Sequence, residues 1–219
     1  MKLKREAKEK FYIAGILLGA FILWTAAVRF VDVQAIGPQG STVGFATFNG
    51  WVHTMTGVHM TLYTITDWLG LVPLGFALGF AILGLIQWMK RGRLRQVDYS
   101  ILVLGGFYLV VMAAYVLFEQ FVVNYRPVLI GGILEASYPS STTMLVLCVM
   151  PTAIMQLNAR IKKHILRRCT AVVMIVFVVF MVIGRFLSGV HWVTDIIGGT
   201  LLSVGLVMMY HAISSLEGT

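Results

Sequence analysis

The sequence predicts an all-α integral membrane protein: a bundle of six transmembrane helices with an outward amphipathic helix at the membrane interface. The first reason is composition. Of 219 residues, 58% are hydrophobic and 12% are charged, and the mean hydropathy is +0.86. A soluble domain carries about twice that charged fraction, because its surface must remain hydrated. The second reason is that the basic residues gather at alternate ends of the apolar segments. No repeat or linker divides residues 1–219, so we expect a single membrane domain.

Six apolar segments approach or reach the roughly 20 residues that a helix needs to cross the hydrocarbon core. They are residues 11–30, 69–89, 101–123, 142–157, 171–186 and about 194–212. The fourth and fifth are short, and we expect flanking polar residues to complete them. The first is too long for a signal peptide and lacks a good cleavage site, so we interpret it as an uncleaved helix.

The distribution of charge predicts the orientation of the bundle. Of 17 Lys and Arg residues, five lie in residues 1–10, four in 90–95 and five in 160–168. Six spans place these segments on one side, together with both termini, and the positive-inside rule makes that side cytoplasmic. The net charge of +8 therefore indicates membrane topology rather than nucleic-acid binding. The outward loops are then residues 31–67, 124–141 and 187–193.

The first outward loop contains an apolar stripe at helical spacing, formed by Phe48, Trp51, Val52 and Met55. Such a helix could pack on the bundle or lie in the interface of the outer leaflet. We favour the interface, because the segment stands outside any span. The two cysteines, Cys148 and Cys169, lie in apolar runs without disulfide or metal-ligand spacing, and we expect them to pack as small apolar residues.

The outward side also carries polar residues that a membrane protein retains at a cost unless they act together. His191 and Asp195 are four residues apart, so on a helix they share a face, and the carboxylate can accept a proton from one imidazole nitrogen. Arg126 and Arg185 supply planar forks that suit phosphate oxygens.

A third group of polar residues lies at the start of the fourth span. Ser140, Ser141 and Thr142 place hydroxyls at a helix N-terminus, where the dipole favours an anion. Alone, a His–Asp pair can be a helix cap and an arginine can be an interfacial anchor. Together, these groups predict a phosphate site around a histidine.

This pattern resembles the type-2 phosphatidic acid phosphatase (PAP2) superfamily, whose motifs read K-x6-R-P, P-S-G-H and S-R-x5-H-x3-D. The corresponding segments here are Glu119-x6-Arg126-Pro127, Pro139-Ser140-Ser141-Thr142 and Gly184-Arg185-x5-His191-x3-Asp195. The order and spacing of the motifs and the six spans also fit, so the resemblance covers most of the chain beyond the first helix.

The resemblance implies a hydrolase that acts on a membrane lipid phosphate at the extracytoplasmic face, with no metal or other cofactor and no obligate protein partner. His191 would attack phosphorus and Asp195 would orient it. The phosphate oxygens would be held by residues of all three motifs: Arg126, Ser140, Ser141, Thr142 and Arg185. The expected location is a bacterial plasma membrane, with both termini in the cytoplasm.

Two positions depart from the family pattern. Glu119 replaces the usual lysine, and Thr142 replaces the histidine that protonates the leaving oxygen. A threonine hydroxyl is no general acid near neutral pH, and Glu119, if protonated, is a candidate donor in its place.

Of the candidate substrates, a polyprenyl diphosphate such as undecaprenyl diphosphate depends least on protonation of its leaving group. The alternatives are a monoester of the phosphatidate or phosphatidylglycerophosphate type, or a protein that binds a lipid phosphate without hydrolysing it. A channel is disfavoured, because no span carries a series of polar residues.

Overall fold

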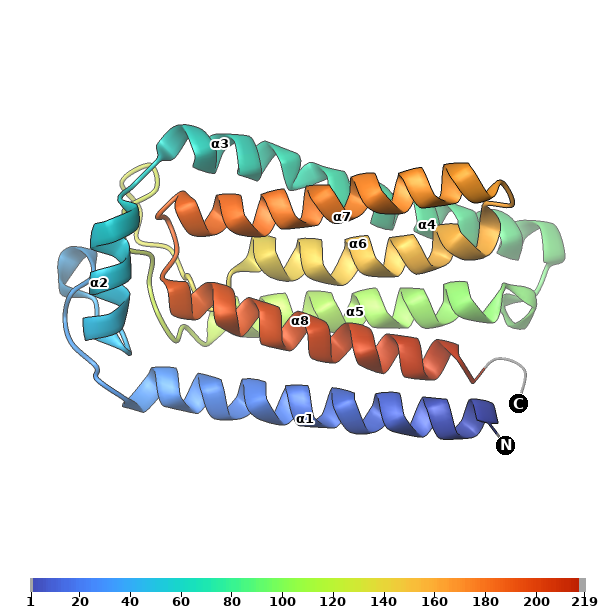
Figure 1. Cartoon of the computed structure of the whole chain (residues 1–219), viewed down its shortest axis with the longest axis horizontal. Helices are drawn as coiled ribbons and strands as arrows, with labels where there is room; N and C mark the ends of the chain where they lie inside the picture. Colours follow the sequence, from blue (N-terminus) through green and yellow to red (C-terminus); the bar gives the residue numbers. More distant parts are fainter. Residues whose placement is uncertain (1, 217–219) are drawn as a thin grey trace.

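The computed structural model describes residues 2–216, with side chains described from residue 7 onward, and it is all-α as predicted. Six helical segments in this part are long and apolar enough to cross a membrane. The helices, shown in Figure 1, are α1 (Lys2–Phe30), α2 (Ala46–Thr56), α3 (Met60–Leu69), α4 (Leu71–Arg91), α5 (Tyr99–Gln120), α6 (Ser141–Arg160), α7 (His164–Leu187) and α8 (Val193–Ser214), with short 3₁₀ turns at Pro38–Gly40 and Leu94–Gln96.

The second span begins earlier than the sequence predicted. Helices α3 and α4 follow one another and give a span of Met60–Arg91, so residues 60–67 belong to a helix and not to the outward loop. Their polar side chains have partners there. Thr64 and Thr66 donate to carbonyls four residues earlier, at 3.0 and 2.9 Å. Asp67 lies 3.6 Å from Arg185 of α7. These contacts explain how a polar stretch can extend an apolar helix.

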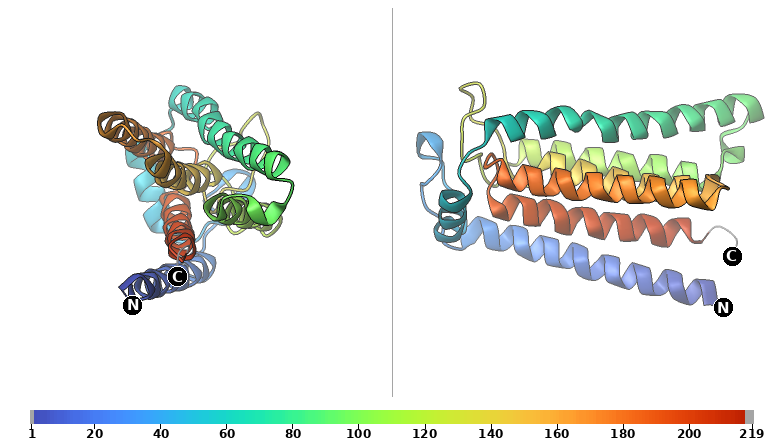
Figure 2. Two further views of the ribbon diagram at one scale, coloured as in Figure 1. Left: turned by 90° about the vertical axis from the view of Figure 1, so that its right-hand side faces the viewer. Right: turned by 45° about the horizontal axis from the view of Figure 1, so that its top comes forward.

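Helices α6 and α8 form the centre of the bundle. About half of each is buried, 56% and 50%, against 17–22% for the other four spans. Helix α6 contacts α4, α5, α7 and α8, whereas α1 packs along α8 (Figure 2). These two helices also carry several residues of the predicted phosphate site, with Asp195 on α8 and Ser141 and Thr142 on α6.

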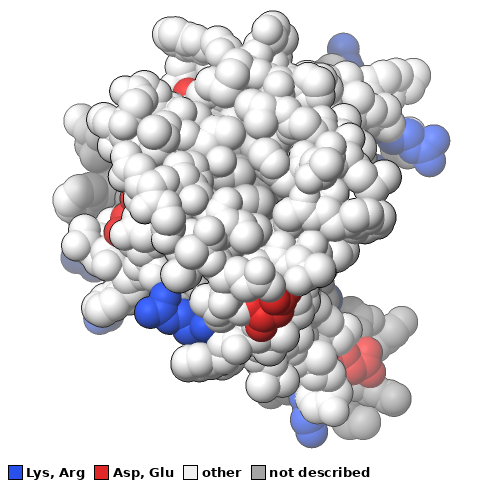
Figure 3. All heavy atoms as spheres, turned by 90° about the vertical axis from the view of Figure 1, so that its left-hand side faces the viewer, with Lys and Arg blue, Asp and Glu red and all other residues white. Residues whose placement is uncertain are grey.

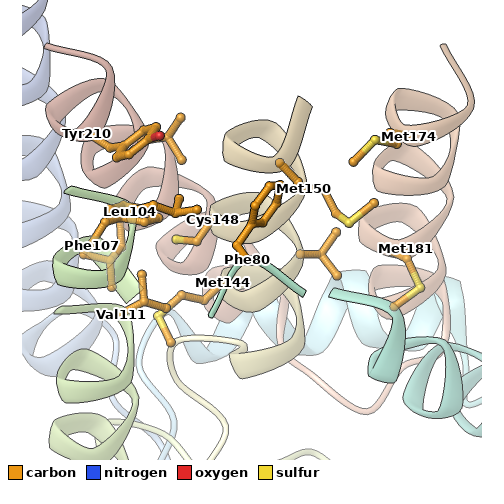
Figure 4. Packing of buried hydrophobic residues seen from close by; sticks show 14 of the residues in the cluster. Phe80, Leu104, Phe107, Val111, Met144, Cys148, Met150, Met174, Met181 and Tyr210 are labelled. Atoms are coloured by element: carbon orange, nitrogen blue, oxygen red, sulfur yellow. The ribbon is translucent and has the colours of Figure 1, made fainter. Parts of the chain in front are cut away.

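The core between these helices consists of aliphatic, aromatic and sulfur-containing side chains. Leu104 and Phe107 of α5 meet Met144 and Cys148 of α6 and Tyr210 of α8 (Figure 4). Cys148 is fully buried as a small packing residue, as predicted, whereas Cys169 on α7 is exposed. The outward faces of the peripheral helices carry exposed Leu, Ile, Val and Phe, as expected for surfaces in contact with lipid.

The two ends of the bundle differ in their loops and charge. The start of α1 and the end of α8 lie at one end, together with the α4–α5 and α6–α7 connections (Figure 1), and this end contains the three basic segments. At the opposite end lie α2 and the loops of residues 31–45, 121–140 and 188–192. Charged groups are sparse on the surface of that end (Figure 3).

Helix α2 lies across this second end, nearly perpendicular to the spans (Figure 1). Ala46 and Asn49 are buried against the bundle, whereas Phe48, Trp51 and Met55 are exposed. The apolar stripe therefore points away from the protein. This arrangement fits an interfacial helix and not one that packs its stripe on the bundle.

Candidate active site

The loop between α7 and α8 holds His191 and is covered by the α2–α3 connection. Gly189 adopts φ +68°, and a Cβ there would lie 1.9 Å from the carbonyl oxygen of Gly57, so the close approach requires glycine. The backbone N–H of His59 donates to the Ser188 carbonyl at 2.9 Å, and the ring of His53 lies 3.1 Å from the Gly189 carbonyl. Under this cover His191 is only 3% exposed.

Asp195 lies in the first turn of α8 and is completely buried. Its Oδ2 accepts the backbone N–H of Trp192 at 2.9 Å, the reach from N3 to the N-cap that stabilises a helix start. The same oxygen accepts the hydroxyl of Ser137 at 2.6 Å, and Oδ1 accepts the side-chain amide of Asn124 at 3.3 Å. Three donors thus satisfy this carboxylate without His191.

The side chains of His191 and Asp195 lie close to each other, as predicted, but they do not form the expected direct hydrogen bond. Nδ1 of His191 is 3.9 Å from Oδ2 of Asp195, which is too long for one. The hydroxyl of Ser137 lies between them, 2.9 Å from Nδ1. Sequence reasoning missed Ser137, although it lies only two residues before the second motif.

The other imidazole nitrogen faces an arginine. Nε2 of His191 is 3.2 Å from a terminal guanidinium nitrogen of Arg126. Burial lowers the pKa of His191 well below its usual value, and the charges of Arg126 and Arg185 lower it further. The imidazole is therefore neutral at pH 7, as a nucleophile or base must be.

Arg126 itself belongs to the long loop between α5 and α6, and it is 7% exposed. Its Nε lies 3.0 Å from Oε2 of Glu135, and its backbone N–H donates to the Glu135 carbonyl at 3.1 Å. The guanidinium is therefore placed between the imidazole of His191 and a carboxylate that the sequence analysis did not identify. Only the folding of the loop back on itself makes Glu135 recognisable as a partner.

Arg185, on the last turn of α7, is 1% exposed. Its guanidinium lies over the ring of Tyr63 at 4.8 Å and 3.6 Å from the carboxylate of Asp67, both on α3. It is near enough to His191 and Arg126 to interact electrostatically with both. Helix α3 thus supplies the immediate partners of this second arginine.

The helix-start hydroxyls occupy different environments. Ser140 is fully buried, and its hydroxyl accepts the N–H of Thr143 at 3.4 Å as the N-cap of α6. Ser141 and Thr142, in the first turn, are half-buried. Ser141 lines a polar pocket of about 500 Å³ with Arg126 and Glu119. Thr142 lines an adjacent apolar groove.

The predicted residues therefore gather at one end of the bundle, in two layers. Arg126 contacts His191 directly, and Ser137 links His191 to Asp195, whereas Glu119 and Ser141 lie at the pocket beside Arg126. In the described residues, no three His, Cys, Asp or Glu side chains are grouped closely enough to hold a metal ion.

A comparison with solved structures identifies a protein of the same fold. A transmembrane PAP2 type phosphatidylglycerolphosphate phosphatase from Bacillus subtilis matches with a TM-score of 0.51. This chain shares its fold. The match covers 92% of this chain and 94% of the phosphatase chain, at 22% sequence identity. No protein-family model matches the sequence, and no curated protein sequence matches it either.

Proposed function

We propose that the protein is a PAP2-type membrane lipid phosphatase that cleaves a terminal phosphate at the extracytoplasmic end of the bundle. The observation that carries this proposal is the neutral, buried imidazole of His191, whose Nε2 faces the guanidinium of Arg126. A nucleophilic nitrogen beside a fixed cation suits attack on a phosphate. The fold shared with a PAP2 type phosphatase supports the same activity.

In the proposed reaction, Nε2 of His191 forms a bond to phosphorus while the bond from phosphorus to the leaving oxygen breaks. The leaving group takes that electron pair, and a water molecule then cleaves the phosphohistidine to release inorganic phosphate. Arg126 leaves its ion pair with Glu135 to bind the substrate, and it then neutralises charge on the phosphoryl oxygens. Arg185 adds a second positive charge nearby. Positioning and charge neutralisation supply most of the rate acceleration in such transfers.

The two cavities beside Arg126 fit a substrate with a polar head and an apolar chain. The polar pocket of about 500 Å³ shares Tyr115 and Ser141 with an apolar groove of about 350 Å³ between α4, α5 and α6. The phosphate end of a lipid would occupy the pocket, and the first part of its chain would lie in the groove. The remaining chain would extend into the bilayer.

We further propose that the preferred substrate is a polyprenyl diphosphate, such as undecaprenyl diphosphate. The reason is Thr142, which cannot protonate a leaving group. A monoester expels an alkoxide, whose conjugate acid is about as weak an acid as water. A diphosphate expels a lipid phosphate with a second pKa of about 6, which leaves readily as an anion. The B. subtilis protein is a phosphatidylglycerolphosphate phosphatase, so a monoester of the phosphatidate or phosphatidylglycerophosphate type is the second candidate for this chain.

The test is phosphate release by the purified protein from undecaprenyl diphosphate, phosphatidate and phosphatidylglycerophosphate. We expect the diphosphate to be hydrolysed fastest and His191→Asn to abolish release, because an amide cannot carry the phosphoryl group. Acid-labile, base-stable labelling of the wild type by ³²P-substrate would identify the phosphohistidine. Lipid binding without phosphate release would instead indicate a binding protein, and wild-type turnover by His191→Asn would exclude the mechanism.

A further inference from the structure

We propose that Ser137 is a positioning residue through which Asp195 controls the tautomer and direction of the His191 imidazole. This inference rests on the proposed function, because it assigns Nε2 of His191 as the attacking atom. Its basis is the chain of contacts Arg126–His191–Ser137–Asp195, with distances of 3.2, 2.9 and 2.6 Å.

The direction of every hydrogen bond in this series of four residues follows from the residues at its two ends, Arg126 and Asp195. Arginine has only donors, so Nε2 of His191 must be the acceptor toward Arg126. A neutral imidazole with an accepting Nε2 carries its proton on Nδ1. The hydroxyl of Ser137 must then accept from Nδ1.

At the opposite end, the buried carboxylate of Asp195 acts as the acceptor. Ser137 has one hydroxyl proton, and the 2.6 Å contact directs it to Oδ2 of Asp195. Its lone pair is thereby turned toward Nδ1 of His191. Both ends impose the same direction, so a single tautomer satisfies the whole chain.

Asp195 makes no direct hydrogen bond to the imidazole of His191. Its Oδ2 lies 3.9 Å from Nδ1 and already accepts the backbone N–H of Trp192. When Nε2 bonds to phosphorus, positive charge develops on the ring while the proton remains on Nδ1. The serine hydroxyl and the carboxylate behind it stabilise that charge without a proton transfer.

The fold holds Ser137 in place through its own backbone and through its neighbour in sequence. Its backbone N–H donates to the Asn124 carbonyl at 2.9 Å, and its side chain is 2% exposed. The next residue, Tyr138, packs against Gly198 of α8, where a Cβ would approach its ring to 2.6 Å. The α5–α6 loop therefore delivers the hydroxyl directly to the first turn of α8.

The first test is Ser137→Ala, with Ser203→Ala as a matched control that removes a buried serine hydroxyl bonded to Gly199 of α8. We expect Ser137→Ala to lower kcat about 10- to 100-fold with KM nearly unchanged, as for outer partners of metal-bound histidines. The control should keep wild-type kcat. A wild-type kcat in Ser137→Ala would overturn the inference.

The second test combines Ser137→Ala with Asp195→Asn. If Asp195 acts through Ser137, the loss of kcat caused by Asp195→Asn should be much smaller in the Ser137→Ala protein than in the wild type. Losses that multiply fully would show that Asp195 acts on His191 by another route, and the inference would fail.

A third measurement needs no turnover and separates this inference from the proposed function. In ¹⁵N-histidine-labelled protein at pH 7.5, with His191→Asn used to assign the signal, we expect a protonated Nδ1 and an unprotonated Nε2. An Nε2–H tautomer would overturn the role of Ser137 even in an active enzyme. An Nδ1–H tautomer in a protein that hydrolyses no lipid phosphate would instead overturn the phosphatase function and leave the hydrogen-bond chain intact.

Discussion

Thr142 is the residue whose replacement best tests the substrate preference. It lies in the first turn of α6, half-buried at the apolar groove, where the PAP2 pattern has histidine. We expect Thr142→His to raise kcat/KM for phosphatidate by at least 10-fold, because general acid catalysis typically contributes about 10²–10⁴-fold. The diphosphate should gain much less, since its leaving group departs as an anion.

The matched control for this substitution is Thr54→His, which introduces the same imidazole at an exposed threonine of α2. It should not raise monoester hydrolysis, because Thr54 lines neither the polar pocket nor the apolar groove. Equal rates for both substrates in the wild type, unchanged in Thr142→His, would contradict the leaving-group argument.

The lowered pKa of His191 makes the stability of the protein depend on pH. The folded imidazole is desolvated and faces Arg126, so it binds a proton less readily than the unfolded chain, where the pKa is about 6.5. As pH falls through about 6.5, the unfolded state takes up a proton that the folded state does not, and the free energy of unfolding decreases. We expect the melting temperature to fall between pH 7.5 and 5.5, with a shallower fall in His191→Asn. An identical slope in both proteins would show that His191 is not held neutral by the fold.

At the residue scale, the sequence predicts several of the residues that gather at the candidate site, but not how they are connected. His191, Asp195 and Arg126 are recognisable from type and spacing, and the structure brings all three together. Ser137 and Glu135 are not, because one hydroxyl or carboxylate in a 20-residue loop carries no periodic signal. Their roles arise only when the loop folds back on Arg126 and Asp195.

Among the secondary-structure elements, the close contact between α8 and the α5–α6 loop fixes the geometry of the site. A Cβ at Gly198 would lie 2.6–2.7 Å from the ring atoms of Tyr138. We expect Gly198→Ala to lower the melting temperature, since overpacking of this kind costs about 1–3 kcal/mol. It should also reduce kcat, because the displaced loop carries Ser137. In Gly79→Ala, a helical control on α4 with open space around the new methyl, neither value should fall. A Gly198→Ala protein as stable and active as the wild type would show that the loop position is not critical.

The helices were predictable where their apolar periodicity or length is strong, and less so where polar residues intervene. The stripe of Phe48, Trp51 and Met55 predicted α2, and the structure exposes that stripe. The early start of α3 was missed, because Thr64, Thr66 and Asp67 resemble loop residues in the sequence. Their hydroxyls bond to the preceding turn, and Asp67 pairs with Arg185, a contact between residues 118 positions apart in sequence that local composition does not reveal.

In the whole molecule, the basic segments and the buried polar residues of the candidate site are separated at opposite ends of the bundle. The basic segments lie at the end of the bundle opposite His191, and the buried polar network lies within the two central helices and the loops above them. If the basic end is cytoplasmic, as the positive-inside rule predicts, a phosphate bound at Arg126 would be reached from the outer leaflet. The orientation therefore determines which leaflet supplies the substrate.

This orientation can be measured with single cysteines in a Cys169→Ala background, which leaves only the buried Cys148. Ile133 is 65% exposed in the loop at the site end, and Arg93 is exposed between α4 and α5 at the basic end. We expect a membrane-impermeant maleimide to label Ile133→Cys in intact cells, and to label Arg93→Cys only after permeabilisation. Labelling of Arg93→Cys alone in intact cells would place the site in the cytoplasm and exclude an outer-leaflet substrate. Labelling of both before permeabilisation would contradict the six-span topology, because the single span α5 lies between these two loops and therefore places them on opposite faces of the membrane.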